Sequence, residues 1–245
     1  MCFGSVSLDT ARNTVVDPIS PGLLGWSQWN ALTALGGAGL CIAAESVLPA
    51  VLLALGSMAR ALVQHGPAQP GMANRLTFGR LTLFAGTLAI ASQSGTGFGA
   101  LVAAAAVCVW ALDGADGWLA RRRGESSAFG AQFDMETDAH VVLLLSLYLV
   151  VTRGFEAWVL ILGALRYLLV LVRWLVRPRA VRERRSVWGR RIYALVMLGL
   201  ATSCVPAWRT VASPLLAAVA LTLISSFIPD FLALKSATDL DQPAA

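Results

Sequence analysis

Charged residues are scarce in this 245-residue chain, and their scarcity decides the class of protein. Asp, Glu, Lys and Arg together make up 13% of the sequence, whereas 57% of it is hydrophobic and the mean hydropathy is +0.68. Soluble domains carry about 25% charged residues. The composition therefore excludes an ordinary soluble domain and predicts an all-α, polytopic integral membrane protein.

Lysine and cysteine are also rare. A single lysine, Lys235, accompanies 18 arginines, and the net charge is +5. No aromatic-interleaved basic patch goes with this charge, so we expect contacts with membrane lipid headgroups and no nucleic-acid partner. The four cysteines lack the pair spacing of a zinc or redox motif, which leaves them as small apolar packing residues.

Long apolar stretches organise the chain. Six of them are long enough to cross or nearly cross a bilayer, at 76–93, 98–112, 132–152, 157–176, 190–206 and 213–234. A further apolar region, 23–63, is interrupted at Glu45 and Pro49. It fits two short crossings, about 27–44 and 46–63, or one tilted or re-entrant element. We therefore expect a flexible N-terminal tail, a membrane extension with its linker, a six-helix core and a C-terminal tail, at 1–22, 23–72, 73–234 and 235–245.

Arginines cluster in alternate connections between the apolar stretches. One cluster is 121–123 and the other lies within 177–191, whereas 92–97, 152–156 and 207–212 carry little charge. By the positive-inside rule, the core then has six crossings with both ends in the cytoplasm. We expect a bacterial inner-membrane protein whose Arg182, Arg184 and Arg185 meet lipid headgroups.

Eight residues of fixed spacing stand out from the apolar background. They follow the pattern D-x2-D-G-x2-A-R-x8-G-x3-D-x3-D and are Asp113, Asp116, Gly117, Ala120, Arg121, Gly130, Asp134 and Asp138. An ionised Asp near mid-bilayer costs about 2.5–3.5 kcal/mol. Spacings of three and four place each Asp pair on one helix face, at the end of one helix and the start of its antiparallel neighbour. The four carboxylates can then converge as a hard-oxygen site for Mg²⁺ or Mn²⁺ at the cytoplasmic edge.

The other residues of the pattern suit an anionic ligand beside that site. Gly117 and Gly130 let a ligand approach the backbone closely, and Arg121 offers a fork of donors to a phosphate. The alternative is that each Asp caps a helix or pairs with a nearby Arg. Capping does not demand this spacing, so we favour the ligand site.

The pattern resembles the signature of the CDP-alcohol phosphotransferases, also called CDP-alcohol phosphatidyltransferases. These integral membrane enzymes move a substituted phosphate from a CDP-linked donor to an alcohol and release CMP. A second family feature, Asn-x-Leu-Thr-x-x-Arg, is matched by Asn74, Leu76, Thr77 and Arg80, with Ala73 where the family usually has Pro. The resemblance covers residues 73–234 and implies a six-helix core, preceded here by one or two extension helices.

The resemblance also implies roles for individual residues. Two divalent cations, Mg²⁺ or Mn²⁺, are expected on Asp113, Asp116, Asp134 and Asp138, and Asp138 is expected to act as the general base as well. The CDP-binding residues are expected to be Asn74, Thr77, Gly117, Arg121 and Gly130. A homodimer is expected because relatives commonly form one.

Arg166 and Arg173 are candidates for binding the acceptor. They lie seven residues apart within an apolar stretch, hence on one helix face, and buried arginine in a bilayer is usually functional. They predict a pocket for a phosphate on the acceptor alcohol, although Arg173 has the alternative of snorkelling to the interface. Arg191 is a third candidate, in a Gly-Arg-Arg-Ile-Tyr stretch at 189–193 that differs from the Gly-Lys-x-Lys-Thr of phosphatidylglycerophosphate synthases.

Glu136 and His140 lie near the Asp pattern but are not expected to belong to the site. Helical spacing turns Glu136 to another face than Asp134 and Asp138, which predicts a peripheral acid. His140 is expected to be an ordinary packing or surface residue.

Together these features predict a membrane enzyme of phospholipid synthesis. It would transfer a phosphatidyl group from CDP-diacylglycerol to a small polar alcohol, with the question of a phosphorylated acceptor left open, and release CMP. One alternative uses CDP-choline or CDP-ethanolamine as donor and diacylglycerol as acceptor. Another is a non-catalytic metal-binding membrane protein or transporter.

Overall fold

The fold is helical throughout the part of the chain that the computed structural model describes. That part comprises residues 21–67, 71–94, 96–124, 127–176 and 187–239, with the backbone alone described at 21, 96, 115–121, 187–188, 190 and 229–239. It contains eight α-helices and no strand, which confirms the all-α prediction. Most of the two predicted tails, as well as Arg182, Arg184 and Arg185, lie outside the described residues.

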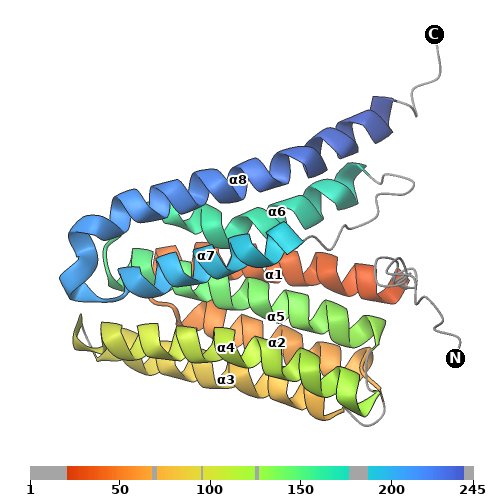
Figure 1. Ribbon diagram of the computed structural model, residues 1–245, viewed down its shortest axis with the longest axis horizontal. Helices are drawn as coiled ribbons and strands as arrows, with labels where there is room; N and C mark the ends of the chain where they lie inside the picture. Colours follow the sequence, from red (N-terminus) through yellow and green to blue (C-terminus); the bar gives the residue numbers. More distant parts are fainter. Residues whose placement is uncertain (1–20, 68–70, 95, 125–126, 177–186, 240–245) are drawn as a thin grey trace, which may run out of the picture.

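Two helices precede a core of six, and Figure 1 shows all of them running roughly along the long axis of the molecule. The extension consists of α1 (Pro21–Ala44) and α2 (Leu48–Gln64). The core helices are α3 (Met72–Gln93), α4 (Gly99–Arg123), α5 (Ala128–Leu147), α6 (Leu160–Val176), α7 (Val187–Ser203) and α8 (Arg209–Asp239). Short connecting turns are η1 (Thr96–Phe98), the π-helical η2 (Tyr148–Thr152), η3 (Ala157–Val159) and η4 (Pro206–Trp208).

The breaks between helices follow from local sequence. Glu45 adopts a φ of 50° after α1, and Pro49 lies in the first turn of α2, where its missing N–H costs nothing. Gly124 follows α4 with a φ of 66°, a conformation that favours glycine. Ser127 then caps α5, because its Oγ accepts a hydrogen bond from the Gly130 N–H at 3.0 Å.

Helix α4 is longer than the apolar stretch that predicted it. It continues beyond residue 112 to Arg123, so Asp113 and Asp116 lie within the helix and not at its end. The last turns contain Leu, Ala and Arg, which are strong helix formers although they are not all apolar. The consequence is that α4 gives Asp113 a rigid helical position.

Three spans of the described residues are long and apolar enough to cross a membrane. They are Ala128–Thr152, Ala157–Val176 and Pro206–Ile228, and shorter apolar helices occur at Leu48–Gln64, Gly99–Gly114 and Arg191–Ser203. This composition is that of an integral membrane protein, whereas the full set of six core crossings stays a prediction. In Ala128–Thr152, 72% of the apolar window is buried by other helices, against 28% and 22% in the other two spans. Helix α5 is therefore the central helix of the bundle.

The extension packs directly on the core. Helix α1 contacts α2, α5 and α6, and α2 contacts α3 and α5. The Trp26 ring of α1 stacks against Phe133 of α5 with 6.3 Å between centroids, and Phe133 in turn stacks on Phe129 at 5.5 Å. Residues 21–64 thus belong to the same bundle as the six core helices.

Gly163 marks a close approach of α6 to α5. A Cβ at this position would lie 2.4 Å from the Leu143 Cα and 2.9 Å from the Leu143 N, and backbone atoms cannot move aside. We expect Gly163→Ala to separate the helices and to destabilise the protein by about 1–3 kcal/mol, the usual cost of overpacking. The measurement is the Tm of the detergent-solubilised protein. Gly79→Ala, where an added Cβ would meet nothing within 4 Å, is the control and should not lower the Tm. Equal Tm values for both variants would contradict the close approach.

Candidate active site

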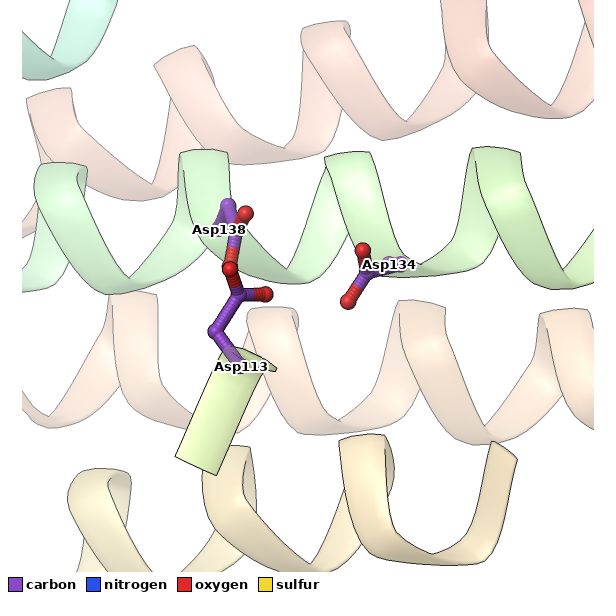
Figure 2. Close-up of side chains that lie close together, drawn as sticks. All are labelled: Asp113, Asp134 and Asp138. Atoms are coloured by element: carbon purple, nitrogen blue, oxygen red, sulfur yellow. The ribbon is translucent and has the colours of Figure 1, made fainter. Parts of the chain in front are cut away.

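Three carboxylates converge where α4 meets α5. Asp113 comes from α4, and Asp134 and Asp138 come from successive turns of α5. One carboxylate oxygen of each lies within 4.8 Å of the others. Figure 2 shows the Asp113 and Asp138 side chains pointing toward one another, with Asp134 one turn nearer the N-terminus of α5. The structure thus brings together three of the four predicted acids, while the side chain of Asp116 lies outside its described part.

The guanidinium of Arg80 lies among these carboxylates. Its Nη1 donates to Asp113 Oδ1 at 2.9 Å, and its Nη2 donates to Asp138 Oδ1 at 3.3 Å and also to Asp134 Oδ1. The Arg80 side chain is completely buried. Helix α3 therefore supplies a cation that bridges all three acids.

Arg80 was not among the site residues predicted from the sequence. A signal was nevertheless present, because Arg80 is the one charged residue in the apolar stretch 76–93. The same argument singled out Arg166 and Arg173, since buried arginine in a membrane helix needs an anionic partner. Applied to Arg80, it would have pointed to the Asp pattern.

The carboxylates fit a divalent cation by charge and by donor type. Three carboxylates gather at partly buried positions around the Arg80 guanidinium, an arrangement whose negative charge a divalent cation would help to balance. Clustered carboxylate oxygens are the ligands that Mg²⁺ and Mn²⁺ prefer. These three Asp residues can therefore hold a metal ion.

Two of the predicted CDP-binding residues, Asn74 of α3 and Gly130 of α5, pack closely together. A Cβ on Gly130 would lie 3.1 Å from the Asn74 Oδ1 and 3.2 Å from the Ser127 Oγ, so these side chains already occupy the space in front of the glycine. Thr77 is buried one turn after Asn74 on α3, and its hydroxyl donates to the Ala73 carbonyl at 3.1 Å. Gly117 and Arg121 belong to the stretch of α4 of which only the backbone is described.

A cavity of about 650 Å³ extends from the carboxylates between α5, α6, α7 and α8. Arg166 and Arg173 line it together with Asp113, Asp134 and Asp138. Most of its remaining wall is apolar and includes Val142, Leu162, Leu169, Val196, Leu223 and Phe227. Arg191 is exposed on α7 and is not among the lining residues. The structure thus places two of the three acceptor candidates in one cavity with the acids.

Glu136 is not the peripheral acid that its helical position predicted. It does lie on another face of α5 than Asp134 and Asp138, but this face is covered by α1 and α6, and Glu136 is completely buried. Its Oε1 accepts a hydrogen bond from Arg166 Nη2 at 2.8 Å. His140, one turn further on, is buried with Nδ1 2.9 Å from the Glu136 carbonyl oxygen, a packing position as expected.

Comparison with known families agrees with this geometry. A family model described as CDP-alcohol phosphatidyltransferase matches residues 71–226, whereas no curated protein and no solved structure matches the chain. The matched region is more than half of the sequence and includes Arg80, the three converging Asp residues and both cavity arginines. Enzymes of this family transfer a phosphatidyl group from a CDP-alcohol to an acceptor and use a divalent metal ion. The chain belongs to the CDP-alcohol phosphatidyltransferase family.

Proposed function

We propose that this protein transfers the phosphatidyl group of CDP-diacylglycerol to a small polar alcohol that itself carries a phosphate, and releases CMP. One observation supports the proposal above the others. A single cavity contains the acids that suit a divalent cation and, beyond them, two arginines that suit a second anion. A phosphate on the acceptor would match the positive charge that these arginines bring to the cavity.

The donor binds at the acidic end of the cavity in this proposal. The divalent cations, Mg²⁺ or Mn²⁺, would be held by the four acids of the pattern, Asp113, Asp116, Asp134 and Asp138. The chemistry that such a cation supplies when bound is neutralisation of the pyrophosphate charge and polarisation of the attacked phosphorus. The nucleotide binds beside Gly130 and Asn74, which the missing side chain of the glycine allows to approach each other closely. Thr77, Gly117 and Arg121 complete the proposed CDP-binding residues.

Asp138 acts as the general base. It lines the cavity, and its carboxylate takes the proton from the acceptor hydroxyl as the hydroxyl oxygen attacks the phosphorus of the phosphatidyl group. The bond between this phosphorus and the CMP oxygen breaks, and CMP leaves with the electron pair. Arg80 holds Asp138 in place through its hydrogen bond and keeps the neighbouring carboxylates together.

The acceptor's phosphate binds at the arginine end. Arg166 and Arg173 are seven residues apart, so two turns of α6 present them on the same side, and both line the cavity. Guanidinium groups bind phosphate oxygens through paired, charge-assisted hydrogen bonds. Holding the phosphate there would orient the hydroxyl of the acceptor toward Asp138.

The site faces the cytoplasm of a bacterial inner membrane in this proposal. The C-terminal ends of α4 and α6 and the N-terminal ends of α5 and α7 lie at the same end of the bundle (Figure 1). Arg122 and Arg123 end α4 there, and in the sequence an arginine-rich stretch follows α6, so the positive-inside rule assigns this end of the bundle to the cytoplasm.

Metal removal and an acceptor panel test the proposal. Purified full-length protein with radiolabelled CDP-diacylglycerol should release CMP when Mg²⁺ or Mn²⁺ and a phosphorylated alcohol are added, and EDTA should lower the rate by at least about a hundredfold. Glycerol phosphate and inositol phosphate are the first acceptors to try, with glycerol and inositol as matched alcohols lacking the phosphate.

The outcomes separate the candidate functions. No CMP release with any alcohol would overturn the transfer reaction and leave a metal-binding or transport role. Turnover of CDP-choline or CDP-ethanolamine with diacylglycerol would establish the alternative donor. Faster reaction with glycerol or inositol than with their phosphates would contradict the phosphorylated acceptor.

A further inference from the structure

Two residues that precede the family domain reach an acid at its centre. Ser27 Oγ of α1 donates to Glu136 Oε1 at 2.7 Å, and Asn30 Nδ2 donates to Glu136 Oε2 at 2.6 Å. Ser57 of α2 in turn donates its hydroxyl to Asn30 Oδ1. The match to the family model begins only at residue 71, so all three of these residues come from the extension. The extension thus supplies partners to a core acid.

The same carboxylate holds a cavity arginine. Besides Ser27, the Glu136 Oε1 accepts from Arg166 Nη2 at 2.8 Å and from Gln132 Nε2 at 3.0 Å. Glu136 has no exposed surface, and a buried carboxylate is tolerated only when donors surround it. Arg166 retains 22% side-chain exposure and lines the cavity. Hydrogen bonds therefore connect α1, through Glu136, to the arginine end of the cavity.

We propose that Glu136 is a positioning residue for the acceptor and that Ser27 and Asn30 of the extension hold it in place. The proposal rests on the proposed function, in which Arg166 contacts the acceptor's phosphate. A guanidinium has five N–H donors on a planar fork, so a fixed carboxylate on Nη2 sets the plane in which the remaining donors meet a second anion. Removing Glu136 takes away a contact that fixes the plane of the Arg166 guanidinium.

The geometry separates this effect from the donor end of the cavity. Glu136 lies on the face of α5 that meets α1 and α6, whereas Asp134 and Asp138 face Arg80 and Asp113. Among the described residues, the Glu136 carboxylate accepts hydrogen bonds from Ser27, Asn30, Gln132 and Arg166 and has none with those acids. Loss of the Glu136 partners should therefore raise the KM for the acceptor and leave kcat and the KM for CDP-diacylglycerol close to their original values.

The test uses the full-length protein and four variants. Asn30→Ala and Ser27→Ala each remove one donor to Glu136, Ser27→Thr restores a hydroxyl, and Glu136→Gln removes the charge that faces Arg166. We expect the KM for the phosphorylated acceptor to rise about tenfold in Asn30→Ala and at least as much in Glu136→Gln, with kcat and donor KM changed by less than about twofold. Ser27→Thr should recover most of the loss seen in Ser27→Ala.

A matched control comes from the same helix. Thr33 donates its hydroxyl to the Asn30 carbonyl oxygen and is not among the donors to Glu136, so Thr33→Ala should leave kcat and both KM values unchanged. Equilibrium binding of radiolabelled glycerol phosphate and inositol phosphate in micelles is measured beside the kinetics. If Glu136→Gln does not fold, the acceptor KM values of Asn30→Ala and Ser27→Ala test the proposal.

Each result has a defined meaning. If the wild type binds glycerol phosphate or inositol phosphate without turnover, the proposed function is wrong. In that case, weaker binding of these phosphates by Asn30→Ala would still support the positioning role of Glu136. The positioning role is overturned if the acceptor KM of the Glu136 and α1 variants is unchanged or lower, or if kcat falls in parallel with the rise in KM. It is also overturned if the wild type binds neither phosphate.

Discussion

Replacing Asp138 with Asn should lower the transfer rate by about 10³-fold, within the range of about 10²–10⁴ that a general base contributes. The amide has the same shape as the carboxylate but cannot take the proton of the acceptor hydroxyl. Asp113 and Asp134 remain in place, so the divalent cation and CDP-diacylglycerol should still bind. The measurement is CMP release at saturating acceptor, together with binding of the donor to the same preparation.

The control for Asp138→Asn is an identical change of acid to amide outside the cavity. Glu156 is exposed in the segment before η3, and Glu156→Gln should retain the wild-type rate within about twofold. The Tm of Asp138→Asn should not fall, because Arg80 keeps its bonds to the other two carboxylates. A transfer rate above about a tenth of the wild-type rate would exclude Asp138 as the base.

Replacing Arg80 with Met should cost both stability and activity. Arg80 is buried and bonded to three carboxylates, and removing one partner of a buried ion pair typically costs about 3–5 kcal/mol. Methionine fills much of the same volume, so the loss is mainly electrostatic. We expect a strongly lowered Tm in EDTA and a transfer rate reduced by at least about a hundredfold, because the acids lose their arrangement.

Divalent cations provide a specific readout for this variant. Without Arg80, Asp113, Asp134 and Asp138 lose the cation that bridges them, and a bound divalent cation can replace its positive charge. The Tm of Arg80→Met should therefore rise more steeply with Mg²⁺ or Mn²⁺ than the wild-type Tm. Arg60→Met is the control, since Arg60 is exposed on α2 and bonds Gln64, and an exposed polar contact contributes little. Equal responses of Arg80→Met and the wild type to metal would show that Arg80 does not organise a metal site.

The helices could be predicted from the sequence because apolar length is directly visible in it. Each of the six apolar core stretches corresponds to one helix, and the interruption at Glu45 and Pro49 is where α1 gives way to α2. Helix α4 extends to Arg123, beyond the residues Asp113 to Gly117 at which the sequence predicted its end. Its last residues keep the helical conformation through backbone propensity, which hydropathy does not report.

The parts of the site that depend on spacing within one helix could be predicted from the sequence. The four-residue spacing of Asp134 and Asp138 placed both on one face of a helix, and the expected antiparallel pairing with the preceding helix brought Asp113 toward them. The partners of Arg80 and Glu136 depend instead on which helices pack together. The helical face of Glu136 followed from its position, but nothing near it in the sequence indicates that Ser27 and Asn30, more than 100 residues earlier, cover that face.

The hydrogen bonds between Glu136 and α1 limit how such a protein can be recombined. An unrelated apolar hairpin grafted before residue 71 would enclose Glu136 without the two donors, Ser27 and Asn30, that α1 supplies. Exchange of the domain between relatives then requires exchange of α1 as well. Positions 27, 30 and 136 are accordingly expected to be inherited as a set, with an apolar residue at 136 wherever the polar pair on α1 is missing.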